Sequence, residues 1–289
     1  MQQIFKSDRS GQIIGHRYRL GTELGSGGQG TVYRGIDLQQ GGEVAIKVME
    51  PTPHDAEWRE RTFREAHALT VLTGTAAVHV LHQAWTGDGA FCIVMELLQG
   101  VDLEKYLRNR EKLGQALDPD DLLPLLAPII ETLEVAHAAG ILHRDIKPGN
   151  VFILDSGEVR LLDFGFAKFT RMRPLTRAGT VAGSPSYIAP EIWADVSPLD
   201  QRIDVYSLGA IIFRALAGRP PFFSEELSEV LTLVTTAPRP SLLKLRPDLP
   251  PNIDAWVEHA LAILPEERFS SAKALYNALL SLFNRRSIA

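Results

Sequence analysis

A polar loop followed by a short hairpin, over residues 143–165, constrains this chain more than any other feature. Two apolar runs, VFIL and VRLL, are joined by Asp-Ser-Gly-Glu, a pattern typical of a β-hairpin. Asn150 precedes the first run and Asp163 follows the second, so both side chains are expected at the open end of the hairpin. An amide oxygen and a carboxylate are ligands that Mg²⁺ accepts. Asp145, five residues before Asn150, is then close enough to accept a proton beside the metal site.

A glycine-rich segment near the N-terminus has the spacing G-x-G-x-x-G at Gly25, Gly27 and Gly30. The same spacing marks dinucleotide-binding loops, but there the glycines open a helix that holds the pyrophosphate. Here the β-branched and aromatic residues TVYRG follow, which predict a strand. We therefore expect a glycine hairpin that can donate backbone N–H groups to phosphates. A turn without a ligand is the alternative.

The next predicted strand, over residues 43–49, carries a candidate phosphate-binding lysine. Period-two alternation places Ala45 and Lys47 on one face and the intervening aliphatic residues in a core. A lysine beside a small residue, under a glycine hairpin, suits a phosphate clamp with room for a base. A solvent-facing strand lysine is the alternative.

A helix-like stretch over residues 55–72 offers three acidic partners for Lys47, namely Glu57, Glu60 and Glu65. At about 100° per residue, Glu65 shares a stripe with mostly apolar residues, whereas Glu60 points about 140° away from Glu65. We therefore expect Glu65 to pair with Lys47.

Composition excludes several other classes of protein. The 289 residues include 30 basic and 35 acidic ones, a formal net charge of −5, which disfavours nonspecific nucleic-acid binding. No apolar stretch reaches the ~18–20 residues that cross a bilayer, so no membrane segment is expected in this chain. The single cysteine, Cys92, lies in the apolar run FCIVM and is expected to be a buried thiol in a reducing, cytoplasmic environment.

These motifs occur in the order found in eukaryotic-type (Hanks-type) protein serine/threonine kinases, and the chain resembles the bacterial members of that family. The resemblance covers nearly the whole chain and implies an α+β, bilobal protein-kinase fold. We expect a flexible lead-in over residues 1–15 and a small antiparallel β-rich N-lobe with one regulatory helix over 16–98. A larger, mainly helical C-lobe is expected over 99–285, with the activation segment over 163–191.

The resemblance also implies where Mg-ATP binds. The glycines form a loop that covers the nucleotide, Val32 and Phe152 flank the adenine, and Lys47 holds the α- and β-phosphates. Met95 is expected at the gatekeeper position beside a hinge that begins at Glu96. The residues expected to contact ATP are Leu24, Gly25, Gly27, Gly30, Val32, Ala45, Lys47, Glu65, Met95, Glu96, Leu98 and Phe152.

Residues of the polar loop take the catalytic roles that the resemblance implies. Asp145 orients the substrate hydroxyl and accepts its proton, and Lys147 neutralises charge on the γ-phosphate; Lys47 completes the catalytic set. Asn150 and Asp163 bind Mg²⁺, with Mn²⁺ as the alternative ion. The pair Lys-Pro after Asp145 is typical of kinases that act on serine and threonine. The expected function is therefore ATP-dependent phosphorylation of Ser/Thr hydroxyls of protein substrates in signalling.

Scaffold residues downstream also match the family. Glu191 ends the motif Ala-Pro-Glu and is placed to pair with Arg268. Asp204 resembles the helix acid that braces the catalytic loop. Pro124 and Pro128 interrupt the helical run before that loop, so a kinked or late-starting helix is expected.

Arg144, directly before Asp145, suggests control by phosphorylation. Between Asp163 and Glu191 the chain has four basic residues and no acidic one, so these charges repel Arg144 until a phosphate arrives. We hypothesise autophosphorylation of Thr176 or Thr180, within a homodimer if it occurs between two copies. The alternative is a basic loop that attracts acidic substrates.

Two other functions compete with the kinase interpretation. A pseudokinase would bind nucleotide or act as a scaffold without transferring phosphate, but Lys47, Asp145, Asn150 and Asp163 are all present. A small-molecule phosphotransferase of related fold usually lacks the equivalent of Lys147 and the Ala-Pro-Glu motif.

Overall fold

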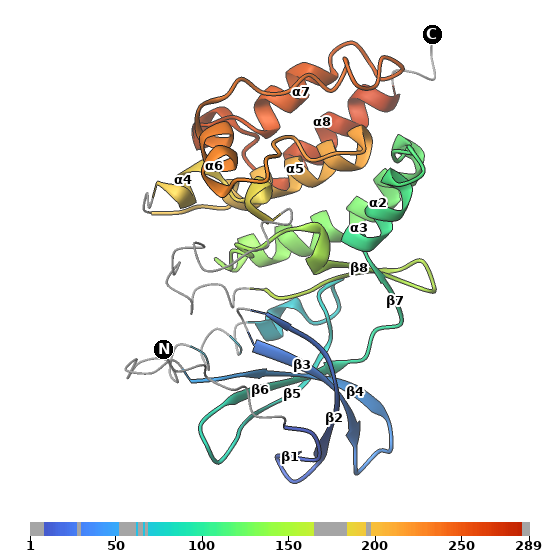
Figure 1. The fold of residues 1–289 in the computed structure, drawn as a ribbon, viewed down its shortest axis with the longest axis vertical. Helices are drawn as coiled ribbons and strands as arrows, with labels where there is room; N and C mark the ends of the chain where they lie inside the picture. The colour runs from blue at the N-terminus through green and yellow to red at the C-terminus, as the bar shows by residue number, and fades with distance from the viewer. Residues whose placement is uncertain are drawn as a thin grey trace. The chain divides into compact units, whose positions relative to one another are not determined.

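The computed structural model describes most of the chain, and its described residues form two compact units. The first is β-rich and contains the described residues up to Thr73 together with Val78–Gln99; the second is mainly helical and contains Gly74–Ala77 and the described residues from Gly100 onward (Figure 1). The described residues are 9–27, 30–51, 62, 66, 69–164, 184–194 and 198–284.

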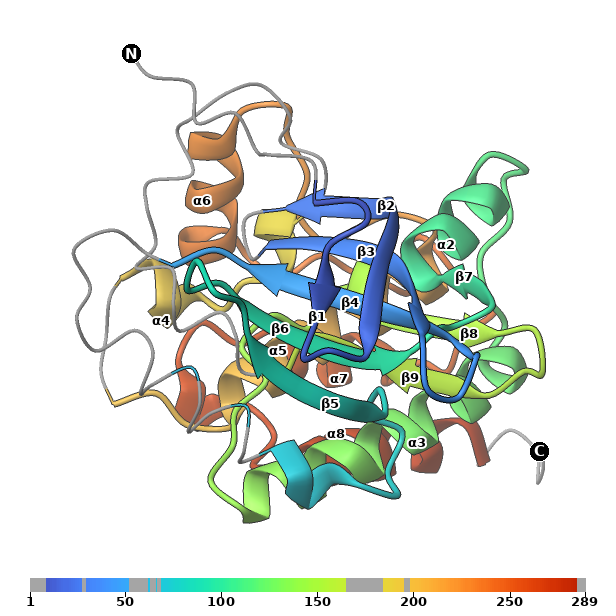
Figure 2. The ribbon, with the colours of Figure 1, turned by 90° about the horizontal axis from the view of Figure 1, so that it is seen from below.

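A six-stranded antiparallel sheet forms the β-rich unit, with strand order β1-β2-β3-β4-β6-β5 (Figure 2). The hairpin of β2 and β3 carries the glycine-rich segment, as predicted. Thr62 and Ala66 are helical, and a 3₁₀ helix, η1, covers Leu69–Leu72. The strands are β1 (Ile13–Ile14), β2 (Tyr18–Gly27), β3 (Gly30–Asp37), β4 (Glu43–Met49), β5 (Val80–Trp85) and β6 (Phe91–Glu96).

The side chains of strand β4 alternate between the two faces of this sheet, as the period-two pattern predicts. Val44, Ile46 and Val48 are buried in one cluster together with Cys92. Burial raises the pKa of the Cys92 thiol to about 12, so this thiol is protonated and inert at neutral pH. On the opposite face the side chain of Lys47 is also buried, so the solvent-facing alternative for this lysine is wrong.

The expected flexible lead-in is corrected over residues 9–15. Residues Ile13–Ile14 pair with β2 as strand β1. The guanidinium of Arg9 is 2.9 Å from Glu50 and 2.7 Å from Asp88, and only 8% of its side chain is exposed. An ion pair between partners this far apart in the sequence attaches the segment to the sheet.

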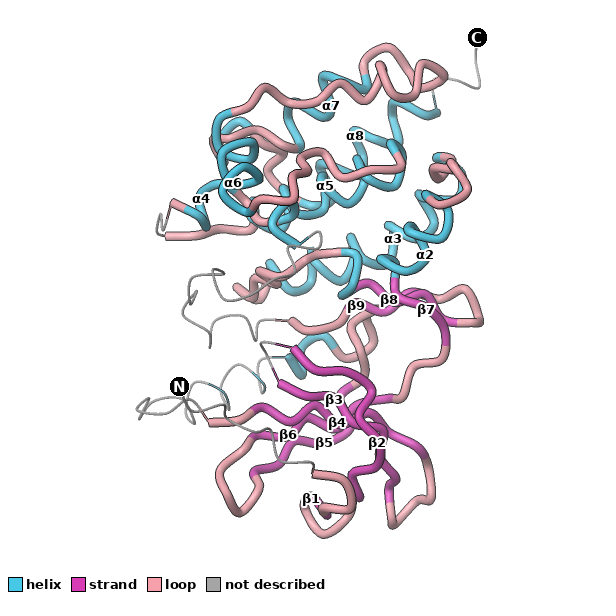
Figure 3. Tube along the Cα trace, viewed as in Figure 1, coloured by secondary structure: helices cyan, strands magenta, loops and turns pink. Residues whose placement is uncertain are grey.

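A small antiparallel sheet, β7-β8-β9, begins the second unit (Figure 3). It comprises β7 (Gly100–Asp102), β8 (Val151–Leu154) and β9 (Val159–Leu161), so the predicted hairpin is confirmed. Seven α-helices and three 3₁₀ helices are described in the same unit. They are α2 (Leu103–Glu111), α3 (Pro119–Ala138), η2 (Pro148–Asn150), η4 (Ser184–Tyr187), α4 (Pro190–Trp193), α5 (Arg202–Ala217), α6 (Leu227–Thr236), α7 (Ile253–Ala260), η5 (Pro265–Glu267) and α8 (Ala272–Asn284).

Helix α5 is the centre of this unit, because every residue from Ile203 to Leu216 is buried. Helices α3, α7 and α8 all contact it. Helix α3 begins at Pro119 and contains Pro124 and Pro128, so of the two expectations, a kink or a late start, the late start is wrong; proline at the first helical position has no N–H to leave unpaired. The α+β fold class is confirmed. Among the described helices, none has both the length and the apolar composition needed to cross a bilayer.

Candidate active site

The polar loop brings three predicted residues into direct contact. The ammonium group of Lys147 donates to the carboxylate of Asp145 at 2.7 and 3.0 Å. The side-chain amide of Asn150 donates to the backbone carbonyl of Asp145 at 2.7 Å and to its carboxylate at 3.0 Å. The Asp145 side chain remains 22% exposed, whereas Asn150 is buried. The carboxylate is therefore held in one orientation while keeping one side accessible.

Asp204 of helix α5 fixes the start of this loop. Its carboxylate accepts the backbone N–H groups of His143 and Arg144, each at 2.8 Å. The predicted bracing role of this buried acid is confirmed. Burial would raise the pKa of Asp204, but the hydrogen bonds from His137 and from the loop backbone outweigh burial, and the pKa lies below its ordinary value. The acid therefore stays ionised and keeps its hold on the loop.

His137 is a member of the site that the sequence interpretation missed. Its Nε2 lies 2.8 Å from Asp204, and the ring is almost fully buried in the last turn of α3. One sequence feature could have indicated this role: His137 lies six residues before His143, at the end of the helix that leads into the loop. A histidine there can reach whatever group supports the loop.

Two residues of the site have strained backbones. Arg144 has φ of 67° and Asp163 has φ of 59°, both in the left-handed region. Such a conformation costs about 1–3 kcal/mol for a residue other than glycine. Only one other non-glycine residue with positive φ, His16, occurs among the described residues. Strain is thus concentrated at the residues that flank Asp145 and the hairpin.

The hairpin places Asn150 and Asp163 at one end, as predicted. The N–H of Leu162 donates to the carbonyl of Asn150 at 2.8 Å, which ties the residue before Asp163 to Asn150. The Nε2–H of His143 donates to the Leu162 carbonyl at 2.9 Å, and the ring packs on Phe164, with ring centroids 4.5 Å apart. Burial lowers the pKa of His143, so this ring is neutral and structural.

The β-rich unit aligns a second set of predicted residues on one face of its sheet. Val32 is opposite Lys47 in the β3–β4 register, and Ala45 is opposite Met95 in the β4–β6 register. The buried cluster of Met49, Ala66, Phe91 and Ile93 continues this face. A cation, a small residue and two apolar side chains therefore lie in adjacent register positions.

The glycines of the hairpin differ in how much space the neighbouring atoms leave for a side chain. Gly30 has φ of 130°, and a β-carbon there would be 2.3 Å from the carbonyl oxygen of Val48, so packing within the protein demands glycine. A β-carbon at Gly25 or Gly27 would meet nothing within 4 Å. Glycine at these two positions is therefore unexplained by internal packing, which is expected where another molecule approaches the backbone.

The other predicted ATP-contacting residues that the structure describes lie on or beside different strands. Leu24 is exposed on β2, and Leu98 is half-buried after β6. Glu96 accepts the N–H of His79 at 2.9 Å through its carboxylate. Phe152 is half-buried on β8 in the helical unit. Glu65, Thr176 and Thr180 lie outside the described residues.

Comparison with known proteins identifies the family. The protein kinase domain family matches residues 18–280, so the chain belongs to it, and the resemblance to bacterial serine/threonine kinases is confirmed. The chain is 36% identical over 285 residues to serine/threonine-protein kinase PknA of Mycobacterium tuberculosis, a match covering 96% of this chain and 63% of PknA. It is 33% identical over 264 residues to PknL of the same organism, covering 91% of this chain and 65% of PknL. The chain thus spans less than two thirds of each relative.

Solved structures agree with this assignment. A crystal structure of the Mycobacterium tuberculosis PknI kinase domain is similar with a TM-score of 0.73 and 28% sequence identity. The similarity covers 94% of this chain and 98% of the PknI chain. The fold is therefore that of a protein kinase.

Proposed function

We propose that this domain is a protein serine/threonine kinase, which transfers the γ-phosphate of ATP to Ser and Thr hydroxyls of protein substrates. The observation that carries the proposal is the contact of Asp145 with both Lys147 and Asn150, in a loop braced by a buried acid. We take residues 16–98 as the N-lobe and 99–285 as the C-lobe.

Asp145 acts as the proton acceptor in this proposal. Its carboxylate orients the substrate hydroxyl and takes its proton as the oxygen bonds to the γ-phosphorus, while the bond from that phosphorus to the β-phosphate oxygen breaks and ADP leaves. Support comes from its partial exposure and its two hydrogen-bond donors, which hold the carboxylate in place. Lys147 lies within 2.7 Å of that carboxylate and can also contact a transferring phosphoryl group. Two charges of opposite sign then serve the attacking and the transferring groups.

Asn150 and Asp163 offer a donor set that suits a divalent cation. The amide nitrogen of Asn150 is used by Asp145, which leaves its amide oxygen as the group for a cation, and Asp163 adds a carboxylate. These oxygen donors fit Mg²⁺, with Mn²⁺ as the alternative. When bound, the ion would offset the negative charge of the triphosphate. The strained backbone of Asp163 supports a functional constraint at that position.

The β-rich unit supplies the nucleotide contacts in this proposal. Gly25 and Gly27 bring backbone N–H groups to the phosphates, and Lys47 donates to the α- and β-phosphates while paired with Glu65. Support for this comes from the burial of Lys47 and the open space beside both glycines. The adenine contacts proposed from this unit are Leu24, Val32, Ala45, Met95, Glu96 and Leu98.

A transfer assay separates this proposal from the pseudokinase alternative. The domain is incubated with γ-labelled ATP, Mg²⁺ and a generic basic protein, alongside Lys47→Met and Asp145→Asn. We expect label on serine or threonine with the wild-type domain and a loss of about 100-fold or more in both variants. Tight Mg-ATP binding without transfer by any of the three proteins would establish a pseudokinase and overturn the proposal.

We further propose activation by autophosphorylation of Thr176 or Thr180 between two copies of the chain in a homodimer, in the cytoplasm. The support is the position of Arg144 beside Asp145 and the acid-free, basic composition of the segment. Intact-mass and peptide spectra after ATP treatment test it. Modification at either threonine with a rise in activity is expected, and full activity with an unmodified segment would refute the switch.

A further inference from the structure

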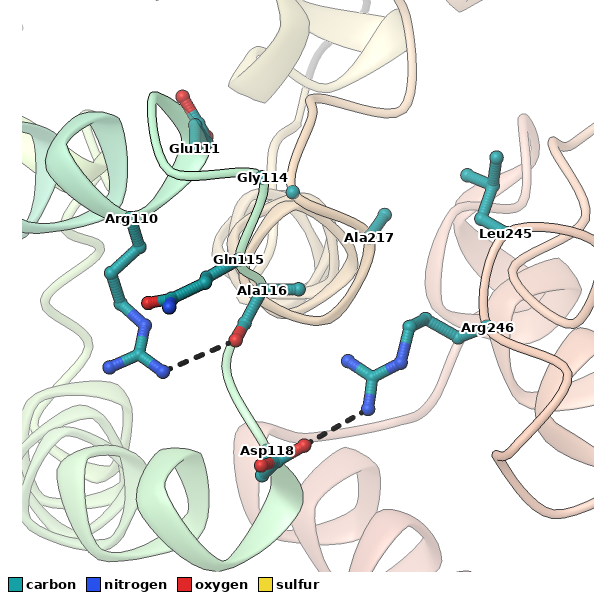
Figure 4. A pocket seen from close by; sticks show the side chains of 10 residues that line it. Arg110, Glu111, Gly114, Gln115, Ala116, Asp118, Ala217, Leu245 and Arg246 are labelled. Carbon is teal, nitrogen blue, oxygen red and sulfur yellow. Dashed lines mark hydrogen bonds and ion pairs between the residues drawn. The ribbon is translucent and has the colours of Figure 1, made fainter.

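A cavity of about 610 Å³ lies in the helical unit, at the C-terminal ends of α2 and α5 and the start of α3 (Figure 4). We call it the α2 pocket, defined by Arg110, Glu111, Gln115, Asp118, Leu245 and Arg246 together with small residues. Its volume falls within the range of about 300–1,000 Å³ that is usual for small-molecule sites. None of its lining residues belongs to the proposed catalytic or nucleotide-binding set.

Arg110 is the cation of this pocket whose hydrogen-bonding capacity is largely unused. It lies in the last turn of α2, and one terminal nitrogen donates to the carbonyl of Ala116 at a long 3.4 Å. Its Nε is buried and makes no hydrogen bond. Among the described residues Arg110 has no ion-pair partner. A guanidinium has five N–H donors, so most of its donors have no fixed acceptor.

The acids beside Arg110 are already engaged elsewhere. Both oxygens of Glu111 accept from the buried guanidinium of Arg214, at 2.8 and 3.2 Å. Asp118 accepts from Arg246 at 3.1 Å (Figure 4). Neither carboxylate accepts a hydrogen bond from Arg110.

Arg246, the other cation of the pocket, differs from Arg110 because its N–H donors have acceptors within the protein. It binds Asp248 through two nitrogens, each at 2.8 Å, and its remaining donors reach the carbonyls of Leu117 and Leu216. Its donors are thus satisfied within the protein. An incoming anion would find its strongest uncompensated donor at Arg110.

Gln115 adds a second donor next to Arg110. Figure 4 shows its side chain beside that of Arg110, with Arg246 on the opposite side of the pocket. The side chain is exposed and makes no hydrogen bond with any other residue that the structure describes. Gly114, Ala116 and Ala217 line the same pocket with little or no side chain, which leaves room for a ligand.

We propose that the α2 pocket binds a small molecule through a carboxylate or phosphate group, with Arg110 as the anchor and Gln115 as a second donor. A guanidinium and an oxyanion form paired, charge-assisted hydrogen bonds, which are shorter and stronger than neutral ones. Binding would supply the acceptors that Arg110 lacks within the protein. The site is separate from the proposed kinase chemistry, so it stands or falls independently of it.

An NMR titration of the arginine Nε–H resonances tests the proposal on the whole chain. Inorganic phosphate and succinate are the two probes, and they distinguish a phosphate site from a carboxylate site. We expect the Arg110 resonance to shift saturably with at least one probe. We also expect Arg110→Gln to weaken binding about tenfold or more, because the paired charged hydrogen bonds are lost.

Lys112→Gln is the matched control, since it removes the same charge from an exposed side chain just after α2. The affinity of the Lys112→Gln chain for both probes should equal that of the wild-type chain. Should Arg110→Gln fail to fold, Gln115→Leu provides the second variant and should also weaken binding. Absence of a saturable shift with both probes would overturn the proposal, and so would equal affinities of the Arg110→Gln and Lys112→Gln chains. Either result would leave Arg110 as a cation that only complements the helix dipole.

Discussion

Arg268 holds Glu191 through two hydrogen bonds of 2.7 Å, and the two side chains are only 0% and 8% exposed. The predicted pairing is therefore confirmed. The remaining nitrogen contacts of Arg268 reach the carbonyls of Ala262, Ile263 and Arg202. This buried ion pair links the Ala-Pro-Glu segment to the loop before α8.

Replacement of Arg268 by methionine should sharply destabilise the helical unit. The variant leaves the Glu191 carboxylate buried without its partner, which costs about 3–5 kcal/mol. Urea unfolding at neutral pH measures the loss. Glu43→Gln, which breaks an exposed pair with Arg34, is the control and should lose much less. Equal stability of the Arg268→Met and wild-type chains would contradict the assigned role.

Tyr187→Phe should lower stability because Arg214 loses an acceptor. The Tyr187 hydroxyl accepts from this buried guanidinium at 2.9 Å, and burial raises the pKa of Tyr187 to about 12, so it is neutral at physiological pH. Removing one partner of a buried hydrogen bond costs about 1–3 kcal/mol. Tyr106→Phe is the matched control, with an expected effect close to zero. Identical unfolding curves for the two variants would refute the importance of the Arg214 contact.

The pair of Arg17 and Asp37 should give the β-rich unit a defined acid sensitivity. The Arg17 guanidinium donates to Asp37 at 2.5 and 2.8 Å and lowers the pKa of this carboxyl from 3.8 to about 2. The pKa of Asp37 is lower in the folded chain than in the unfolded chain. The contribution of this ion pair to folding stability is therefore complete above about pH 4 and is lost as the pH falls toward 2. Carboxyl NMR titration measures the pKa, which Arg17→Ala should return toward 3.8. A wild-type pKa near 4 would contradict this account.

The stability difference between the wild-type chain and Asp37→Asn follows the same linkage. It should be constant above about pH 4 and shrink between about pH 4 and 2, as the wild-type carboxylate becomes protonated. Denaturant unfolding at several pH values tests this. A difference that does not change with pH across that window would show that the ion pair is not responsible.

Alanine substitutions in the glycine hairpin should separate folding from nucleotide binding. Gly30→Ala forces a β-carbon against the Val48 carbonyl and should destabilise the chain by about 1–3 kcal/mol. Gly25→Ala meets no neighbour and should change stability by less than about 0.5 kcal/mol while weakening ATP binding. Thermal unfolding and ATP titration measure the two effects. Loss of stability in Gly25→Ala with unchanged ATP affinity would argue against a phosphate-covering role.

Local patterns predicted the parts of the fold that depend on neighbouring residues. The two faces of β4 follow from period-two alternation, and the β8–β9 hairpin follows from two apolar runs around a turn. The predicted position of Asn150 and Asp163 at one end of that hairpin followed from the same pattern. Family resemblance then supplied the roles of these residues.

Contacts between distant residues could not be read from such patterns. Arg9 pairs with Asp88 across 79 residues, and Arg214 pairs with Glu104 across 110. No local periodicity encodes these partners, because only the folded chain brings them together. The start of α3 at Pro119 was missed for another reason: interior prolines suggested an interrupted helix, but burial against α5 and α8 outweighs the lost hydrogen bonds.

The most direct test of the central claim compares the wild-type chain with Asp145→Asn in single-turnover phosphoryl transfer, together with Mg-ATP affinity. The substitution keeps the size of the side chain and removes the proton acceptor. We predict a fall in the transfer rate of about 100- to 10,000-fold with little change in the dissociation constant for Mg-ATP. Equal transfer rates for the two proteins would contradict the assignment of Asp145 as the catalytic base.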